Sequence, residues 1–418
     1  MNHKFSIITP AHKNTPYHKE LYDSILAQTY TNWEWILWLN NDIKRDLLPK
    51  EFEEDDRVII YETDNTSKNV GYHKHHAFHK GTGDVLVEVD SDDILDPRCL
   101  EFLDEAYQDS EVGFAFSDSA IWDDDFVPYN ADHGWTHYLY KFRDKNLTAM
   151  RTWQPTSHSI GYIWYAPDHV RSWRKDIYLQ IGGHNEELSI CDDHELMIRT
   201  YLVTKMYHIK RPLYIYRVTG DNTYLERNAK IQTETVRLFN ENAYALAERD
   251  ADLRGLLKVD IGGGLFPRPG YMTIDQEGAD VNWDLDLGIP LEDNSVGVLN
   301  ASHIIEHLRD PIRTMREIHR VLAHGGWAMI EGPSTDGRGA WQDPTHVSFW
   351  NEHSFWYYTD INKAQFIRNT DIRFQTYRLD TWEMQPNIPV VTAWLVAIKN
   401  DIRLPGILSI CKKNVRFA

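Results

Sequence analysis

The sequence predicts an α/β protein with two sheet-containing domains, and three observations lead to this expectation. Short β-rich runs alternate with longer amphipathic runs over most of the 418 residues, a rhythm typical of parallel sheets. Two such series begin separately, at residue 4 and near residue 256. Between Asp221 and Arg254 the chain has no Gly and no Pro, and apolar residues recur at loosely helical spacing. We therefore expect domains at 1–224 and 256–418, joined by a helical connector at 225–255.

Charge and cysteine content limit the partners and the compartment. Asp and Glu (63) exceed Lys and Arg (44), which gives a formal net charge of -19. Negative charge repels a phosphate backbone, so we expect no nucleic-acid partner. Cys99, Cys191 and Cys411 lie far apart and predict neither a disulfide framework nor a four-thiolate zinc site. No run approaches the ~18 apolar residues of a membrane helix, so we expect a cytoplasmic protein without a transmembrane segment. The oligomeric state is not indicated.

In the first half, four short runs are expected to be strands: KFSIITP, WEWILWL, RVIIYE and VLVEVD. The last of these, within residues 83–93, ends in Asp90, Asp92 and Asp93. Carboxylates at positions i and i+2 of an extended segment can share one hard cation, and a divalent ion there would neutralise a diphosphate such as that of a nucleotide sugar. Taken alone, the Asp-x-Asp spacing is explained equally well by a solvated turn.

Three longer blocks give this spacing a context. They are SIITPAHKNTPYHKELYDSILAQTYTNWEWILW (6–38), NVGYHKHHAFHKGTGDVLVEVDSDDILDP (69–97) and GGHNEELSICDDHELMIR (182–199). In this order they make residues 4–224 resemble the family 2 glycosyltransferases of the GT-A fold. The resemblance implies a GT-A nucleotide-sugar-binding domain that uses Mn²⁺ or Mg²⁺, a nucleotide-sugar donor and a glycan acceptor, with inversion of configuration at the transferred sugar.

The resemblance also assigns residues to the donor site. It implies that Asp90 lies near the ribose and the metal, that Asp92 is the main metal ligand and that Pro10 lines the nucleotide pocket. Lys68 and Gly71 are implied as further neighbours of the nucleotide. The metal is thus expected on Asp90 and Asp92.

The acidic pair of the third block falls on Asp192 and Asp193, and Asp193 takes the place of the general base. Such a carboxylate stands opposite the leaving diphosphate and removes the proton of the acceptor hydroxyl. Asn40 stands where the family usually has an Asp that recognises the base, and an amide offers a different donor and acceptor pattern. Thr219 stands where relatives often have a metal-binding His. The identity of the base is therefore left open.

Between the Asp-x-Asp strand and Asp193 lies a segment rich in Trp and His. Aromatic faces can stack on the C–H faces of sugar rings, so one or two of these residues could shape an acceptor site, although we expect most to be core. They are Trp135, Trp153, Trp164, Trp173, His133, His137 and His158.

The second half opens with LLKVDIGGG (256–264), an apolar strand followed by a turn in which backbone can approach a nucleoside without Cβ interference. Asp275, at the end of YMTID, could accept hydrogen bonds from both hydroxyls of a ribose. Pro267 and Pro269 between them prevent a full crossover helix. The missing helix start argues against a dinucleotide and favours a ligand without phosphates.

Further runs extend this pattern: YMTID, NWDLD (282–286), LEDNSVGVLNASHIIEHLRDP (291–311) and REIHRVLAHGGWAMIEGPS (316–334). With VDIGGG they make residues 256–360 resemble the class I, type-11-like methyltransferases, which implies a compact Rossmann-like domain with S-adenosyl-L-methionine as cofactor. By position the resemblance assigns Asp260, Gly262, Gly263 and Gly264 to the methionine part, Asp275 to the ribose, Asp284 or Asp286 to the adenine side and His303 to the sulfonium region.

Two histidine-containing segments of this half have competing interpretations. HIIEH (303–307) fits the His-x-x-Glu-His pattern of a zinc peptidase, but we expect the methyltransferase-like interpretation to hold, because no third zinc ligand is apparent. The loop at 334–359 follows the fifth strand of the pattern, where an acceptor pocket is expected. The candidates there are Asp343, His346 and Trp350, of which His346 could take a hydroxyl proton or could simply anchor the loop.

These features together predict a bifunctional enzyme that transfers a sugar and methylates a glycan, in polysaccharide or glycoconjugate assembly. Fusion would raise the effective concentration of a newly added sugar at the second site. A second interpretation makes the C-terminal domain a non-catalytic binding or scaffolding module, because the crossover helix is missing. A third makes the first half a glycan-binding domain and leaves catalysis to the methyltransferase. The donor sugar, the acceptor and the methylated atom are left open.

Overall fold

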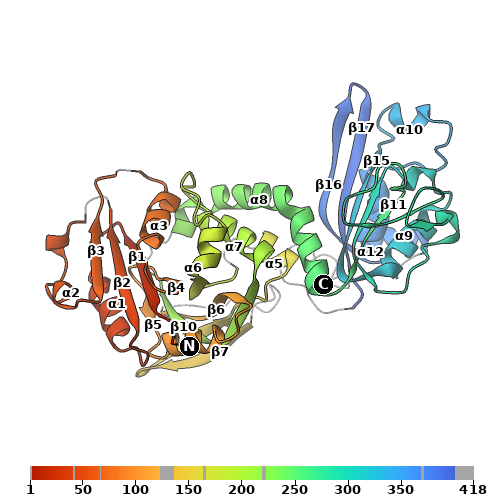
Figure 1. Cartoon of the computed structure of the whole chain (residues 1–418). Helices are drawn as coiled ribbons and strands as arrows, with labels where there is room; N and C mark the ends of the chain where they lie inside the picture. The colour runs from red at the N-terminus through yellow and green to blue at the C-terminus, as the bar shows by residue number, and fades with distance from the viewer. Residues whose placement is uncertain are drawn as a thin grey trace. The chain divides into compact units, whose positions relative to one another are not determined.

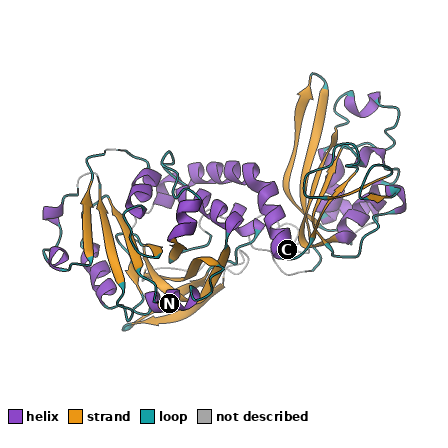
Figure 2. Ribbon diagram, in the orientation of Figure 1, coloured by secondary structure: helices purple, strands orange, loops and turns teal. Residues whose placement is uncertain are grey.

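The computed structural model describes residues 2–40, 43–65, 67–122, 136–162, 166–218, 223–368 and 371–400. The chain divides into two compact units, Met1–Ala243 and Tyr244–Ala418, each built around its own sheet (Figures 1 and 2). Both units combine helices with a sheet, which confirms the predicted α/β class.

The sheet of the first unit is mixed, whereas the sequence rhythm predicted a parallel one. Its order is β3-β2-β1-β4-β9-β6-β10-β5, with a β7–β8 hairpin attached to β6. The four predicted strands are parallel: β1 (Phe5–Ala11), β2 (Trp33–Leu39), β3 (Val58–Glu62) and β4 (Val85–Glu88). The remaining strands are β5 (Ile94–Leu95), β6 (Val112–Trp122), β7 (Thr136–Phe142), β8 (Lys145–Arg151), β9 (Arg171–Arg174) and β10 (Lys205–Arg217). β9 pairs antiparallel with both β4 and β6, and this reverses the sheet direction at its centre.

Helices cover both faces of this sheet because each of its central strands is apolar on both sides. α1 (Tyr17–Leu26) and α4 (Cys99–Ala106) pack on one face, and α3 (Val70–Phe78), α6 (Lys175–Gln180) and α7 (Asp192–Val203) pack on the other. Shorter helices are η1 (Arg45–Leu47), α2 (Glu51–Glu54) and α5 (Ser157–Tyr162). The N-termini of α3 and α7 thereby lie on the same side of the sheet.

One long helix, α8 (Thr223–Leu253), covers most of the segment expected to be a connector. Its last turns pack within the second unit, where the Tyr244 hydroxyl donates to Asn300 Oδ1 at 3.0 Å and the Tyr244 ring meets Trp394 edge to face. Ile231, Leu238 and Phe239, which carry its apolar spacing, are buried.

The sheet of the second unit has the order β13-β12-β11-β14-β15-β17-β16. Its first five strands run parallel in the order 3-2-1-4-5 of a Rossmann-type sheet. They are β11 (Leu257–Ile261), β12 (Met272–Asp275), β13 (Val281–Asn282), β14 (Val296–Ser302) and β15 (Leu322–Pro333). β16 (Phe374–Gln385) and β17 (Ile388–Ala397) form a hairpin, and β17 lies antiparallel to β15. No helix occurs between β11 and β12, as the two prolines predicted.

The helices of the second unit are α9 (Pro311–Val321), α10 (Gly339–Gln342), α11 (Glu352–Thr359) and α12 (Ile361–Ala364), with single turns η3 (Leu285–Leu287), η4 (Ile305–His307) and η5 (Gln365–Ile367). α9 begins at Pro311 because the Asp310 side chain accepts hydrogen bonds from the N–H groups of Ile312 and Arg313. Its buried face, Met315, Ile318 and Val321, packs against the sheet.

In the part of the chain that the structure describes, no helix combines the length and the apolar character needed to cross a membrane.

Candidate active sites

The first candidate site lies at the carboxyl ends of β1, β2 and β4. Pro10 is near the end of β1, Asn40 follows β2 directly, and Asp90 and Asp92 follow β4. These three strands are adjacent and parallel, so their carboxyl ends meet at one edge of the sheet. In open α/β sheets this edge is where ligands bind.

The backbone of the Asp-x-Asp segment is held by hydrogen bonds to neighbouring side chains. The N–H of Asp90 donates to the Tyr214 hydroxyl at 3.0 Å, and Arg217 Nε donates to the carbonyl oxygen of Asp92 at 2.9 Å. Burial, and then repulsion by Asp90, raise the pKa of Asp92 to about 6. Two mutually repelling carboxylates that are both partly exposed fit a bound divalent cation, which would relieve that repulsion.

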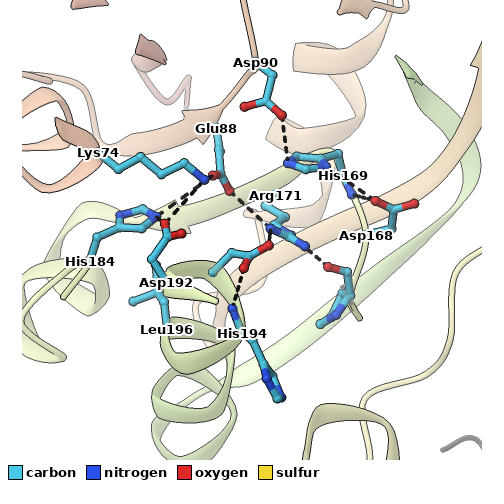
Figure 3. A network of polar contacts seen from close by, with 12 residues as sticks. Lys74, Glu88, Asp90, Asp168, His169, Arg171, His184, Asp192, His194 and Leu196 are labelled. Carbon is cyan, nitrogen blue, oxygen red and sulfur yellow. Dashed lines mark hydrogen bonds and ion pairs between the residues drawn. The ribbon is translucent and has the colours of Figure 1, made fainter. Parts of the chain in front are cut away.

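A buried ion network lies directly behind this segment (Figure 3). Glu88, the last residue of β4, is fully buried and lies 2.6 Å from Lys74 Nζ and 3.7 Å from Arg171 Nη1. Burial acts to raise the pKa of Glu88, but the two cations outweigh it and hold the pKa well below its usual range. The carboxylate therefore stays ionised inside the unit.

Asp193, the second residue of α7, is held by Arg171. The guanidinium Nη1 donates to Asp193 Oδ2 at 2.9 Å, and the N–H of His194 donates to Asp193 Oδ1 at 2.8 Å. Burial acts to raise the pKa of Asp193, but Arg171 and then Lys74 outweigh it, and the pKa is lowered. The side chain is 19% exposed, so an ionised carboxylate remains within reach of a ligand.

Asp192 faces the opposite side of the network. Its Oδ2 lies 3.5 Å from Lys74 Nζ and 3.9 Å from His184 Nε2. Burial, only partly offset by Lys74, raises the pKa of Asp192 to about 6, and burial lowers the pKa of His184 to about 3. His184 is thus neutral, and the two acids of the pair have opposite tendencies toward protonation.

The β4–β9 pairing joins the Asp-x-Asp segment to Asp193. Glu88 and Arg171 are directly opposite each other in this antiparallel pair. His169, two residues before Arg171, lies 3.8 Å from Asp90 Oδ2, whereas Arg171 itself binds Asp193. Asp90 and Asp193 are therefore connected through residues only two positions apart on one segment, and Figure 3 shows His169 beside Asp90.

The other residues expected at the donor site differ in what they contact. The buried Asn40 side chain has no hydrogen-bond partner for Oδ1 among the described residues. Lys68 is exposed in the loop before α3. Gly71 is a close-packing residue, because its N–H donates to the carbonyl of Leu188 at 3.1 Å and an added Cβ would overlap the carbonyl of Asn185.

The expected acceptor-site aromatics are mostly core. Trp153, Trp173 and His158 are buried, and His137 is half-buried. Trp135, Trp164, His133 and Thr219 lie outside the described residues.

The second candidate site surrounds the glycine turn after β11. Asp260 accepts hydrogen bonds from Asn300 Nδ2 at 2.7 Å and from the N–H of Arg268 at 2.8 Å, which closes the turn over residues 261–268. Gly262 has a φ of +78, and a Cβ there would lie 2.6 Å from the Ile304 side chain. A Cβ on Gly263 would overlap the Asp260 carboxylate. Glycine at these positions lets the turn, called here the glycine cradle, pack closely on Ile304 and Asp260, where a side chain would clash.

Asp275, at the carboxyl end of β12, borders this cradle. It accepts hydrogen bonds from the N–H of Gly264 at 3.0 Å and from its neighbour Gln276 at 2.7 Å. Each carboxylate oxygen has a second lone pair, so the partly exposed group can still accept two ribose hydroxyls. The carboxylate and the cradle together fit the ribose and the methionine part of a nucleoside cofactor.

The remaining residues expected at the cofactor lie around the same edge. Asp284 is exposed and caps η3, accepting from the N–H of Asp286 at 3.0 Å, and Asp286 in turn accepts from the N–H of Arg309 at 2.9 Å. His303 follows β14, and the nearby carboxylate of Glu306 raises the pKa of its imidazole.

The loop after β15 brings His346 to the HIIEH segment. A nitrogen or oxygen from each of Glu306, His307 and His346 lies within 4.8 Å of the others. This set differs from the one that the His-x-x-Glu-His pattern would use, because it omits His303 and takes His346 from 39 residues beyond His307 in the sequence. Trp350 is buried in the core, whereas Asp343 is exposed.

Sequence reasoning missed the buried network of Lys74, Glu88 and Arg171. A signal was present for Glu88, because a charged residue within the apolar run VLVEVD needs a counter-charge once the strand is buried. The identity of the counter-charges depends on which strand pairs with β4, and this pairing has no local signature.

Residues 6–164 match the model of glycosyl transferase family 2, and residues 275–330 match a model described as a methyltransferase domain. The chain joins a family 2 glycosyltransferase domain to a methyltransferase domain. Together with the two strand orders, this confirms the predicted fold class, a GT-A domain followed by a Rossmann-like methyltransferase domain.

Two curated relatives match part of the chain. The glucosyl-dolichyl phosphate glucuronosyltransferase of Haloferax volcanii is 20% identical over 213 residues, which cover 51% of this chain and 62% of the relative. An uncharacterized protein of Mycobacterium tuberculosis is 24% identical over 139 residues, which cover 33% of this chain and 43% of that protein. The chain thus spans less than two thirds of the length of either relative.

Solved structures with similarity to the chain include S. aureus TarS residues 1–349 in complex with UDP, at a TM-score of 0.44 and 15% identity over 60% of this chain and 70% of that one. The mannosyltransferase PcManGT from Pyrobaculum calidifontis, in complex with GDP-Man and Mn²⁺, has a TM-score of 0.43 and 13% identity over 61% of this chain and 74% of that one.

Proposed function

We propose that the chain is a bifunctional enzyme in which the glycosyltransferase domain transfers a sugar from a nucleotide sugar to a glycan hydroxyl and the methyltransferase domain methylates a glycan. The observation that carries the first activity is the link from Asp90 through His169 and Arg171 to Asp193. It supports a single donor site with acidic groups at both ends. The activity named for the Haloferax volcanii relative, glucuronosyl transfer to a glucosyl-dolichyl phosphate, supports a glycoconjugate acceptor.

In the sugar-transfer step, Asn40 and Pro10 would bind the nucleoside, with Lys68 at the edge of the pocket. Asp90 and Asp92 would hold Mn²⁺ or Mg²⁺, and the cation would neutralise the charge of the leaving diphosphate. Asp193 is kept ionised by Arg171, so it can accept the proton of the acceptor hydroxyl as its oxygen attacks the anomeric carbon. Attack from the face opposite the diphosphate inverts the configuration at that carbon.

In the methyl-transfer step, the cradle of Gly262, Gly263 and Gly264 and the carboxylate of Asp275 would bind S-adenosyl-L-methionine, which supplies the reactive methyl group. Asp284 and Asp286 would flank the adenine, and His303 would lie near the sulfonium. His346 can accept the proton of a hydroxyl at Nε2, because its Nδ1 donates to the carbonyl of Ala340 at 3.0 Å. The cofactor and the acceptor hydroxyl then need only to be positioned for in-line displacement at the methyl carbon.

We place this activity in the cytoplasm, in polysaccharide or glycoconjugate assembly. Cys99 and Cys191 are free and buried thiols, which supports a reducing compartment.

The alternative keeps the sugar transfer and makes the methyltransferase domain a binding or scaffolding module. One observation favours it: residues 262–271 contain no helix, so the turn has no helix N-terminus directed at the ligand. Calorimetry separates the two, since binding of S-adenosylmethionine or S-adenosylhomocysteine contradicts the module and its absence supports it.

A comparison of site variants in both activities tests the proposed function. The full chain is incubated with nucleotide sugars, Mn²⁺, glycan acceptors and isotopically labelled S-adenosylmethionine, and products are identified by mass spectrometry. Asp92→Asn should abolish addition of the sugar but retain binding of S-adenosylmethionine, and Asp275→Asn should do the reverse. Asp144→Asn, in the exposed turn between β7 and β8, is the matched control and should retain both. Sugar transfer that survives Asp92→Asn without added metal would contradict the donor-site assignment.

A further inference from the structure

Three potential metal ligands converge at the edge of the methyltransferase domain, outside the glycine cradle. Glu306 and His307 belong to η4, which follows β14, and His346 lies in the loop that follows β15 and α10. One ligand atom of each lies within 4.8 Å of the other two. Over the described ranges, they form the one group of three or more His, Cys, Asp or Glu residues that meets this distance. Two strands that end at the same edge thus supply one cluster.

The Glu306 carboxylate is buried without a full set of partners. Glu306 is 2% exposed, and no described group donates a hydrogen bond to its Oε2, while Oε1 lies 3.5 Å from His303 Nδ1. A buried carboxylate oxygen without a donor is costly, by several kcal/mol in general, unless a cation binds it. Gly332 leaves space beside this oxygen, because a Cβ there would lie 3.3 Å from Oε2.

The two imidazoles are oriented as metal ligands usually are. His307 Nδ1 lies 3.3 Å from the carbonyl of Thr345, and His346 Nδ1 lies 3.0 Å from the carbonyl of Ala340. Donation from Nδ1 to a backbone carbonyl leaves the lone pair on Nε2 and fixes the plane of the ring. Both histidines therefore present an unprotonated nitrogen from a ring held by the backbone.

The backbone around the cluster is also tied together. The N–H groups of Val347 and Ser348 both donate to the carbonyl of Glu306, at 2.9 and 3.0 Å, and the Ser348 hydroxyl donates to the carbonyl of Ile305 at 2.8 Å. These bonds fix the loop that carries His346 against η4. The exposed Asp343 carboxylate, 3.9 Å from His346 Nε2, adds negative charge beside the cluster. A metal would therefore meet a largely preformed set of ligands.

We propose that Glu306, His307 and His346 bind one divalent transition-metal ion, with Zn²⁺ as the best match. Two imidazoles and one carboxylate suit borderline-soft ions better than Mg²⁺ or Ca²⁺, which prefer sets of oxygen ligands. Three protein ligands also leave a coordination position open for water or a ligand oxygen, as in catalytic zinc sites.

The site has a consequence for the methyl-transfer step, and this consequence alone rests on the proposed function. With Nε2 bound to the ion, His346 is a ligand and no longer the proton acceptor. A hydroxyl in the open position would instead lose its proton to solvent more easily, because the ion lowers its pKa, and its oxygen would form the bond to the methyl carbon as the methyl–sulfur bond breaks. The acceptor would then be a glycan with an oxygen that can reach the ion.

Metal titration of the full chain tests the site without any substrate. Every protein carries Asp92→Asn, so that the acidic segment of the first unit contributes little, and is stripped with a chelator before calorimetric titration with Zn²⁺. The chain with Asp92→Asn alone, called here the parent, should bind one Zn²⁺ ion. Co²⁺ bound to the parent should give the visible absorption of a nitrogen-ligated site. His346→Ala and the isosteric Glu306→Gln should each weaken Zn²⁺ binding by about tenfold or more.

His353→Ala removes an exposed histidine of the same unit and is the matched control, which should bind Zn²⁺ as the parent does. Melting temperatures without metal establish that the variants are folded, and Zn²⁺ should raise the melting temperature of the parent but not that of Glu306→Gln. A parent that binds no ion, or equal binding by Glu306→Gln and the parent, would overturn the proposal. Because no methyl donor is present, an inactive methyltransferase domain would leave a positive metal result intact.

Discussion

The two units hold their acidic site residues in different ways. In the first, Glu88 and Asp193 are balanced by the buried cations Lys74 and Arg171. In the second, Asp260 and Asp275 accept hydrogen bonds from backbone N–H groups and an amide, next to glycines at which an added Cβ would overlap neighbouring atoms. The first site therefore depends on each charge being matched, and the second depends on volume. Substitutions that remove a charge should mainly affect the first unit, and substitutions that add volume should mainly affect the second.

Removal of Arg171, the cation that Glu88 and Asp193 share, should have the largest effect on stability. Arg171→Met leaves Glu88 and Asp193 short of a buried counter-charge, which typically costs about 3–5 kcal/mol. The expected result is a decrease of this size in the opening free energies of amides in β4 and α7, measured by hydrogen exchange with mass spectrometry. Peptides of the second unit should not change. Lys205→Met, which breaks an exposed ion pair with Asp109, is the control and should leave β4 and α7 as they are. Equal effects of the two substitutions would show that Arg171 stabilises the first unit no more than an exposed ion pair does.

The addition of one methyl group at the second site should have the next largest effect. In Gly264→Ala, the new Cβ would lie 2.5 Å from the carbonyl oxygen of Glu277 and 2.9 Å from Asp275 Oδ2. Overpacking of this kind costs about 1–3 kcal/mol, so we expect binding of S-adenosylmethionine to weaken by roughly ten- to a hundredfold in calorimetry. Nucleotide-sugar binding by the same variant is the internal control. Unchanged affinity for S-adenosylmethionine would mean that this turn does not contact the cofactor.

The stability of the first unit should depend on pH through His184. Burial lowers the pKa of His184 from 6.5 to about 3, so between these values the unfolded chain binds a proton that the native chain does not. The stability of the first unit should therefore fall as the pH falls through this range, by about 1.4 kcal/mol per pH unit from this group. In His184→Asn the slope of the opening free energy against pH should be smaller by that amount. An unchanged slope would show that His184 does not stay neutral in the native unit.

The smallest effect is expected at Asn40. Its Oδ1 has no hydrogen-bond partner among the described residues, and we expect the donor base to supply one. Asn40→Ala should therefore lose about one hydrogen bond, or roughly 0.5–1.5 kcal/mol, which corresponds to a several-fold weaker nucleotide-sugar affinity. Binding of S-adenosylmethionine should stay the same. A variant that binds the nucleotide sugar as tightly as the native chain would place the base elsewhere.

Residues that act through local pattern could be predicted from the sequence. The runs around Ile7, Leu37, Val87, Val259 and Val298 are apolar and β-rich, and each is a buried central strand. Because the carboxyl ends of parallel strands meet, these runs also predict that Asp90 and Asn40 lie near one edge. The fold class and the general position of both sites follow from this reasoning.

Residues that act through pairing between distant segments could not be predicted in this way. Arg171 reaches Glu88 because β9 pairs antiparallel with β4, and no local feature of RSWR indicates its partner strand. His346 reaches Glu306 because the loop after β15 folds back onto η4 through backbone hydrogen bonds. The mixed direction of the first sheet was missed for the same reason, since strand direction depends on pairing rather than on composition.

The most direct test of the account separates binding from turnover in Asp193→Asn. If Asp193 is the general base, this variant should bind a nucleotide sugar in the presence of Mn²⁺ with an affinity close to that of the native chain, because a base in this role would face the acceptor and not the nucleotide. Transfer of the sugar should fall by about 10²–10⁴-fold, the usual contribution of a general base. A variant that transfers sugar at the native rate would contradict the central claim that Arg171 holds Asp193 ionised in order to activate the acceptor.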